Sequence, residues 1–285
     1  MKNDRRRLLL AAGAVLAQAA LPGAARALAA DTTLETQQPG ALRIALYADF
    51  PPYSARGKGV DVALGKALAE KLGLRAEFVE FPPGEDMGDD LRNMVWRGHY
   101  LGTRPGDVML HVPVDARFAA QHDKVLIFGP YHLETMAIAR NPARVPPVAG
   151  SAAVGLEVFT REAIGAEVDT HASDFLLHVL NGRLREQVRH FRSAAEAVEA
   201  MRRGEIAAVM GTHTELQGAL SGEGGFALDR LTLPEMRASQ WPIGMAVKAD
   251  AGPLADALAG ALAELQRSGA LARLYAEHGL SLNTP

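Results

Sequence analysis

Aromatic, acidic and hydroxyl side chains gather in the segments that follow the predicted strands. In α/β proteins the loops at the carboxyl ends of strands commonly form the ligand-binding site, so these segments are where binding chemistry is expected. Aromatic rings there could sandwich a flat or apolar ligand, although Phe50 and Tyr131 could equally pack the lobes. The candidate ligand-binding residues are Tyr47, Asp49, Phe50, Tyr53, His111, Asp115, Tyr131 and Thr212.

An acidic segment between residues 85 and 90 raises the question of a metal site. Glu85, Asp86, Asp89 and Asp90 supply oxygen ligands of the kind that bind Ca²⁺ or a lanthanide. Their spacing lacks the alternating ligands and the closing glutamate of an EF-hand loop. Interaction with a helix N-terminus explains Asp89 and Asp90 without a metal. We therefore predict no metal site and no cofactor.

The sequence offers no catalytic motif. It contains no cysteine, which excludes thiol nucleophiles, disulfides and thiolate metal sites. No Ser-His-Asp set, phosphate-binding loop or zinc motif is recognisable. Glu157, expected just after a strand at Val154–Gly155, could act as a general acid, but no partner base accompanies it. We therefore expect a binding protein and not an enzyme, and we place Glu157 among the ligand-binding candidates.

The first 30 residues have the organisation of a secretory signal peptide. A basic segment, Lys2–Arg7, precedes an apolar stretch of 14 residues, Leu8–Leu21. Ala27–Ala29 offers an A-x-A cleavage site, and the paired arginines also fit a twin-arginine export signal. The alternative, an uncleaved membrane anchor, would need a longer apolar stretch. We predict export to the periplasm, with cleavage near Ala29.

Composition and charge restrict the partners of the exported chain. The full chain has 285 residues, of which 48% are hydrophobic and 22% charged, as in soluble globular proteins. Without residues 1–30 it keeps 25 basic and 32 acidic residues, a net charge of −7. An acidic protein is a poor partner for nucleic acid or anionic lipid. We therefore expect neither nucleic acid nor membrane as a partner of the mature form.

Hydrophobic periodicity predicts alternating strands and helices. Residues 42–46 and 76–81 alternate as strands do, and residues 60–72 carry an apolar side chain every four positions, as in a helix. This βαβ order indicates an α/β fold. The pattern of a helix, a terminating glycine and a strand recurs in the second half of the chain and suggests two similar lobes. A further helix is expected over 254–274, and the polar residues 31–41 are expected to form a flexible leader.

The carboxyl-terminal part resembles the end of the family 3 solute-binding proteins, which serve ABC transporters of polar amino acids. The resemblance rests on Trp241–Lys248 and Ala263–Leu280, with support from Phe50–Tyr53, Phe128–Tyr131 and Glu196–Ile206. It implies the type II periplasmic binding protein fold, with two α/β lobes, a two-stranded hinge and a ligand cleft between the lobes. The implied lobes are 42–138 with 248–285 (lobe 1), and 139–247 (lobe 2).

Residues 84–102 and 107–115 carry a second, narrower resemblance. They are similar to the J-type periplasmic accessory proteins of PQQ-dependent methanol dehydrogenases, and to the wider group of quinoprotein-dehydrogenase-associated proteins. Ordinary amino-acid binders lack the His99–Leu101 insertion. The resemblance implies a periplasmic PQQ-dependent alcohol dehydrogenase as partner, and aromatic and basic side chains here suit protein contact. The expected contact residues are Asp89, Asp90, Arg92, Trp96, Arg97, His99 and Tyr100.

The family resemblance also bears on the ligand. Family 3 proteins clamp a ligand carboxylate with an arginine, whose local counterpart is Arg117, although Arg117 could equally be an ordinary surface arginine. They hold the ligand ammonium with an aspartate at a position that is Thr212 here, and a hydroxyl does not supply that charge. We therefore predict weak or no binding of ordinary α-amino acids. The alternative function is an ABC-transporter receptor for a small polar solute, and we expect a monomer in either case.

Overall fold

The structure is a computed structural model that describes residues 34–222 and 224–285. The predicted signal peptide, residues 1–30, lies outside the described residues. Within the expected leader, the backbone N–H of Gln37 donates to Asp107 Oδ1 at 2.8 Å, and Ala41 is the buried first residue of a strand. The prediction of a flexible leader over 31–41 is therefore wrong at its carboxyl end, because Gln37 is bonded to Asp107 and Ala41 belongs to a strand.

Strands and helices alternate along the described residues. The strands are β1 (Ala41–Tyr47), β2 (Arg75–Phe81), β3 (Val108–Pro113), β4 (Val125–Arg140), β5 (Ile164–Glu167), β6 (Val188–Phe191), β7 (Ala208–Thr212), β8 (Ala227–Arg230) and β9 (Gln240–Lys248). The helices are α1 (Val60–Lys71), α2 (Met87–Leu91), α3 (Ala116–Ala120), α4 (Ala152–Gly155), α5 (His171–His178), α6 (Ala194–Arg202), α7 (His213–Leu220), α8 (Gly252–Arg267) and α9 (Ala270–Glu277). A π-helical turn covers Arg92–Trp96, and 3₁₀ turns cover Glu157–Thr160 and Val179–Gly182.

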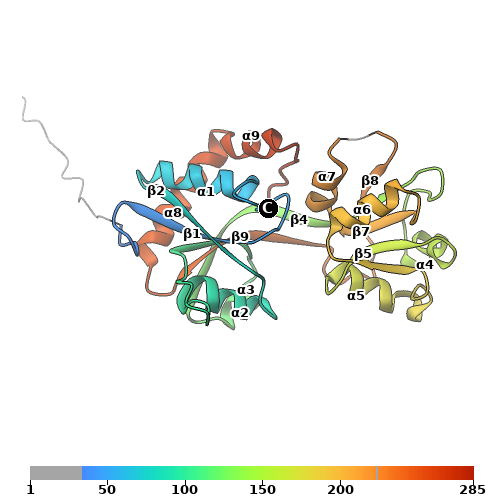
Figure 1. Cartoon of the computed structure of the whole chain (residues 1–285), viewed down its shortest axis with the longest axis horizontal. Coiled ribbons are helices and arrows are strands. Elements are labelled where there is room, and N and C mark those ends of the chain that lie inside the picture. The colour runs from blue at the N-terminus through green and yellow to red at the C-terminus, as the bar shows by residue number, and fades with distance from the viewer. Residues whose placement is uncertain (1–33, 223) are drawn as a thin grey trace, which may run out of the picture. The chain divides into compact units, whose positions relative to one another are not determined.

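Strands β4 and β9 pair with each other and run through both lobes (Figure 1). The strand order is β2-β1-β3-β9-β4-β7-β5-β6, with β8 also paired to β4. In the first lobe β1 pairs in parallel with β2 and β3, and in the second lobe β5 pairs in parallel with β6 and β7. The predicted α/β fold with two lobes and a two-stranded hinge is confirmed.

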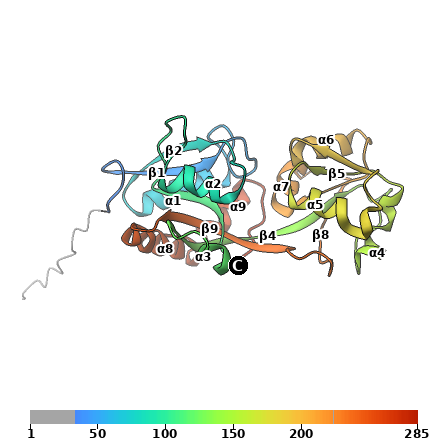
Figure 2. The ribbon, with the colours of Figure 1, turned by 90° about the horizontal axis from the view of Figure 1, so that it is seen from below.

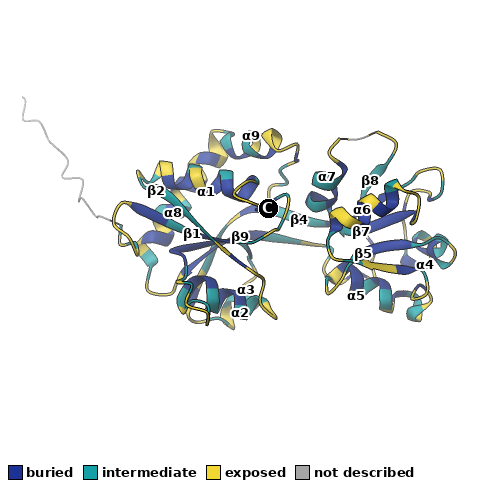
Figure 3. Ribbon diagram, in the orientation of Figure 1, coloured by how far each residue is buried: buried dark blue, intermediate teal, exposed yellow. Residues whose placement is uncertain are grey.

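Each lobe has helices on both faces of its part of the sheet (Figure 2). Side chains alternate across a strand, so Ile44 and Leu46 of β1 pack with α1, α8 and α9, whereas Ala45 faces the opposite core beside α2. In the second lobe, α4 and α5 cover one face and α6 and α7 the other. Buried residues follow the strands and the inward helix faces, as Figure 3 shows. The carboxyl ends of the parallel strands are left to form the site.

The lobe boundaries differ from those expected. Tyr131 packs in the core of the first lobe and Met136 in that of the second, so β4 changes lobe before the expected position 138. In β9, residues 243–246 pair with β3, and Val247 packs in the first core. Residues 243–247 therefore belong to lobe 1 and not to lobe 2. Both crossing strands continue unbroken between lobes, so no turn in the sequence marks where they cross.

The helix expected over 254–274 is two helices. The chain breaks after α8 at Gly269, whose φ of 70° is a left-handed conformation that favours glycine. Because α9 then starts in a new direction, Leu271 and Tyr275 are its buried residues, and the expected Leu274 is only half-buried.

Candidate functional site

Two cavities lie between the lobes and share part of their walls. The larger, about 610 Å³, is lined by the Asp49–Pro52 loop that follows β1 and by residues of α6 and α7. The smaller, about 300 Å³, lies where β5 and β7 end, beside Trp241 of β9. Phe50, Glu167 and Glu215 line both, so we treat the two as one cleft.

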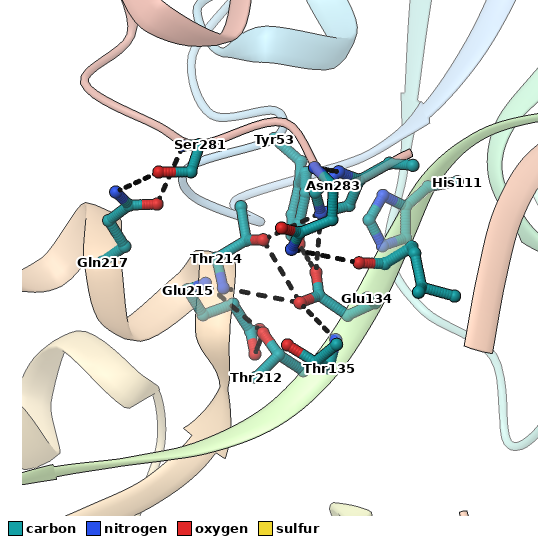
Figure 4. A network of polar contacts seen from close by, with 12 residues as sticks. Tyr53, His111, Glu134, Thr135, Thr212, Thr214, Glu215, Gln217, Ser281 and Asn283 are labelled. Atoms are coloured by element: carbon teal, nitrogen blue, oxygen red, sulfur yellow. Dashed lines mark hydrogen bonds and ion pairs between the residues drawn. The ribbon is translucent and has the colours of Figure 1, made fainter. Parts of the chain in front are cut away.

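Glu215 stands in the first turn of α7 (Figure 4) and lines both cavities. Its backbone N–H donates to Thr212 Oγ1 at 3.3 Å, and the Thr212 hydroxyl donates to Glu215 Oε2 at 2.6 Å. Burial raises the pKa of Glu215 to about 7, and the nearby carboxylates of Glu167 and Glu134 add to the shift. The Thr212 hydroxyl and His111 act in the opposite direction. Glu215 therefore gains and loses its proton near neutral pH.

Glu167 is the second carboxylate of the cleft. It is the last residue of β5, and its Oε2 accepts the backbone N–H of Ala194, the first residue of α6, at 3.0 Å. Burial raises the pKa of Glu167, and Glu196 adds to the shift, while the bond from Ala194 opposes it. Among residues 34–222 and 224–285, neither Glu167 nor Glu215 forms an ion pair with a basic side chain. In the part of the chain that the structure describes, these two carboxylates of the cleft thus have no fixed counter-ion.

A buried polar network joins the lobes at the hinge (Figure 4). The carboxylate of Glu134 on β4 accepts hydrogen bonds from the Tyr53 hydroxyl, from Thr214 Oγ1 at 3.2 Å and from the Thr135 N–H at 3.1 Å. Burial raises the pKa of Glu134, and the hydrogen bonds from Tyr53 and Thr135 oppose this shift. Tyr53, a ligand candidate in the sequence, is fully used by this network and lines neither cavity.

His111 and Tyr131 gather around a buried aspartate. His111 sits at an irregularity in the β3–β9 pairing with a φ of 65°. Its Nδ1 lies 3.1 Å from Asp61 Oδ2, and the Tyr131 hydroxyl donates to Asp61 Oδ1 at 3.1 Å. The His111 ring packs against Phe50 and Tyr53, with centroids 4.9 and 4.1 Å apart. The His111 ring therefore holds the Phe50 ring in place. His111 and Tyr131 themselves line neither cavity.

Four further candidates lie away from the two cavities. The Tyr47 hydroxyl donates to Asp90 Oδ2 at 2.6 Å. Asp115 caps α3 by accepting the Phe118 N–H at 2.7 Å, and Arg117 on that short helix is exposed. Glu157 follows a helix, not the expected strand at Val154–Gly155, and pairs with Arg183 at 3.0 Å. Of the ten candidates, Asp49, Phe50 and Thr212 line the cleft.

Three residues of the cleft, Glu167, Glu215 and Trp241, were not among the candidates expected from the sequence. Glu215 follows Thr212 by three residues, which is the spacing of a helix capping pair and signals a helix N-terminus at the strand end. Glu167 ends β5, a strand that was not predicted, since the strand was expected at Val154–Gly155, where the structure has a helix. The prediction of Glu157 as the acid at a strand end is therefore wrong.

The expected partner-contact residues divide into buried and exposed groups. Asp90 is buried and also accepts the Gly84 N–H at 2.6 Å, so it is unsuited to partner contact, while Asp89 pairs with Arg92 at 2.9 Å. Trp96 packs partly against the core beside α2. Arg97 is exposed, and the His99 ring lies 4.4 Å from the Tyr100 ring on the loop that follows. Tyr100 is 86% exposed and the adjacent Leu101 75%.

We expect standard L-amino acids to bind with dissociation constants weaker than about 1 mM. Recognition of an α-carboxylate needs a matching cation. Among the described residues the first lobe directs no arginine into the cleft, since Arg117 is exposed and lines neither cavity, and the second lobe's Arg192 and Arg202 line only the larger cavity. Isothermal titration calorimetry with the twenty amino acids measures this. A micromolar dissociation constant for any of them would contradict it.

Residues 34–222 and 224–285 contain neither a metal-ligating cluster nor a membrane-spanning helix. No group of three or more histidine, aspartate or glutamate side chains is placed to hold a metal ion. No helix of this part has the length and apolar character that crossing a membrane requires.

Comparison with known proteins rests on structure. No family model matches the sequence, and no curated protein sequence matches it. An ancestral cationic amino acid solute-binding protein matches with a TM-score of 0.63 at 20% identity, over 84% of this chain and 95% of that one. An amino acid ABC transporter substrate-binding protein from Streptococcus pneumoniae, bound to L-arginine, matches with a TM-score of 0.58 at 17% identity, over 84% and 94%. A histidine kinase sensor domain similar to periplasmic binding proteins matches with a TM-score of 0.58 at 19% identity, over 86% and 98%. The described residues therefore have the fold of the periplasmic binding proteins.

Proposed function

We propose that the chain is a non-catalytic, exported binding protein of the family 3 type, which holds a small molecule between its lobes. The observation that carries this proposal is the cleft, whose walls come from both lobes and contain two half-buried carboxylates. A cavity with a few polar groups set among apolar walls is typical of small-molecule sites. The fold agrees, since solved proteins of this fold include binders of amino acids.

Native mass spectrometry of the protein, gently isolated from its own periplasm, tests this proposal. We expect a monomer that carries one small molecule, which is released when the protein is unfolded. Absence of any small molecule, together with no thermal stabilisation by a broad solute panel, would count against a binding function.

The finer proposal is that the chain acts as an accessory protein of a periplasmic PQQ-dependent alcohol dehydrogenase. Besides the resemblance of residues 84–102, the adjacent exposed side chains of Tyr100 and Leu101 support it. Large apolar side chains that stand together in solvent are typical of protein contacts. The alternative remains a receptor for an ABC transporter, which the cleft supports equally well.

We expect the double substitution Tyr100→Ser and Leu101→Ser to weaken binding to the purified dehydrogenase by about tenfold or more, because both side chains lose their contact area. Biolayer interferometry measures the dissociation constant. Val154→Ser is the matched control, since Val154 is 74% exposed but lies on the second lobe. Equal binding by the wild type and both variants would contradict docking through this loop, and no binding by the wild type would favour the transport receptor.

A further inference from the structure

The walls of the smaller cavity combine two carboxylates with apolar and aromatic groups. Glu167 and Glu215 supply the carboxylates, and Phe50, Trp241 and two methionines supply much of the rest. Among the described residues, the cavity is lined by no lysine or arginine, and His171 is its one basic side chain. Such a wall attracts a positive charge through the carboxylates, and aromatic faces favour a cation as well.

The chain's own side chains satisfy part of each helix N-terminus around the cavity. Helices α5, α6 and α7 all begin here, and a helix N-terminus ordinarily attracts anions. Hydroxyls of Thr170, Ser193 and Thr212 accept the first free N–H groups, and Glu167 accepts another at α6. An anionic ligand would therefore compete with the protein's own acceptors, one of which is the Glu167 carboxylate.

The larger cavity extends this negative character. It is lined by five carboxylate side chains, Asp49, Glu167, Glu196, Glu199 and Glu215, against two arginines, Arg192 and Arg202. Arg202 donates to Glu199 of the same wall and to the Ala219 carbonyl at 2.9 Å, which leaves four carboxylates and Arg192 in this cavity. The raised pKa values of Glu167 and Glu215 agree with this geometry, since both carboxylates are desolvated without a cation to offset the loss of water.

We infer that the cleft takes a small organic cation, an ammonium ion with an apolar body and no carboxylate group. The inference rests on the proposed binding function and names the ligand class of the same site. The ammonium lies against Glu167 and Glu215, and the apolar body lies between Phe50 and Trp241. A ligand with a carboxylate finds no free cation beside it in the smaller cavity and is repelled by the two glutamates.

Two sets of probes, matched in shape, separate charge from size. The first set is choline, its neutral isostere 3,3-dimethylbutan-1-ol, and glycine betaine, which adds a carboxylate. The second set is n-butylammonium, butan-1-ol and 4-aminobutanoate. By calorimetry at pH 8, we expect at least one of the two cations to bind about tenfold or more tightly than both of its matched analogues.

Glutamine substitutions test the assignment of residues. We expect Glu215→Gln and Glu167→Gln each to weaken binding of the preferred cation by about tenfold, because shape is kept and charge is lost. Glu205→Gln is the control, since Glu205 lies on the same lobe but lines neither cavity and pairs with Arg203. Circular dichroism and thermal unfolding check that each variant is folded.

The outcomes separate this inference from the proposed function. Tighter binding of a neutral or carboxylate-bearing analogue, or unchanged affinity in both glutamine variants, would overturn the inference and leave the binding function standing. Release of an anion or an amino acid from the native protein would likewise overturn the inference and leave the binding function standing. If no probe binds and the native protein releases no small molecule, the proposed function itself fails.

Discussion

Replacement of Glu215 by glutamine is expected to raise the free energy of unfolding by about 3 kcal/mol at pH 8 and to change it little at pH 4. The folded protein raises the pKa of this carboxyl from 4.5 to about 7 through burial. Between these two values the folded state keeps a proton that the unfolded state has lost, so wild-type stability falls as the pH rises through this window. Glutamine stays neutral and does not suffer this loss.

Urea unfolding of the two proteins at pH 4, 6 and 8 measures the difference, which should grow with pH and level off above pH 7. Other ionisable groups titrate in both proteins, so their contributions cancel in the comparison. Glu205→Gln is again the control and should show no such growth, because Arg203 lowers the pKa of Glu205 where burial raises that of Glu215. A Glu215→Gln variant that is less stable than wild type at pH 8 would contradict the assignment.

The same variant is expected to bind a cation more weakly, so stability and affinity should change in opposite directions. A purely structural glutamate would lose stability on substitution and have no effect on the ligand. A carboxylate that destabilises the empty fold and strengthens ligand binding is the behaviour of a binding residue, in which stability is given up for function. The pair of measurements therefore separates a ligand-binding role for Glu215 from a helix-capping role.

The sequence predicted helices and strands well where the hydrophobic periodicity and the residues that end an element, such as glycine, agree. The strand at 42–46 alternates cleanly and the helix at 60–72 is followed by a glycine, and both appear within one residue of the expected bounds. The lobe boundaries were less predictable because β4 and β9 cross between lobes inside continuous strands. Which half of β9 joins which lobe depends on its pairing with β3, a contact between segments far apart in the chain.

Residues of the cleft were predicted only where they follow a strand whose end is recognisable in the sequence. Asp49 and Phe50 follow β1, whose position was clear, and they line the cleft. The second lobe was harder, because the strand that carries Glu167 is only four residues long and contains glycine and alanine. Arg117 was suggested by family resemblance alone, and the short helix that carries it leaves its side chain exposed.

Replacement of Gly59 by alanine is expected to lower the free energy of unfolding by about 4 kcal/mol or more. Gly59 precedes α1 with a φ of 125°, and a Cβ atom built there would lie 2.2 Å from the Tyr53 carbonyl oxygen and 2.7 Å from that of Pro52. Neither clash can be relieved by a side-chain rotation, because both atoms belong to the backbone. Gly57→Ala is the matched control, since its Cβ would meet nothing within 4 Å, and the left-handed φ of 71° should cost about 1 kcal/mol.

The effect should reach the cleft as well as the fold. The carbonyls of Pro52 and Tyr53 accept the first N–H groups of α1, from Val60 at 3.1 Å and Asp61 at 3.0 Å, and this close approach is what only glycine at position 59 allows. Moving those carbonyls displaces the loop that carries Phe50 into the cleft and the Tyr53 ring that reaches Glu134 at the hinge. Under conditions where Gly59→Ala remains folded, its affinity for the preferred cation should therefore fall, whereas that of Gly57→Ala should not. Equal stability of the two variants would show that the loop adapts, and that Phe50 is not held in the cleft by this contact.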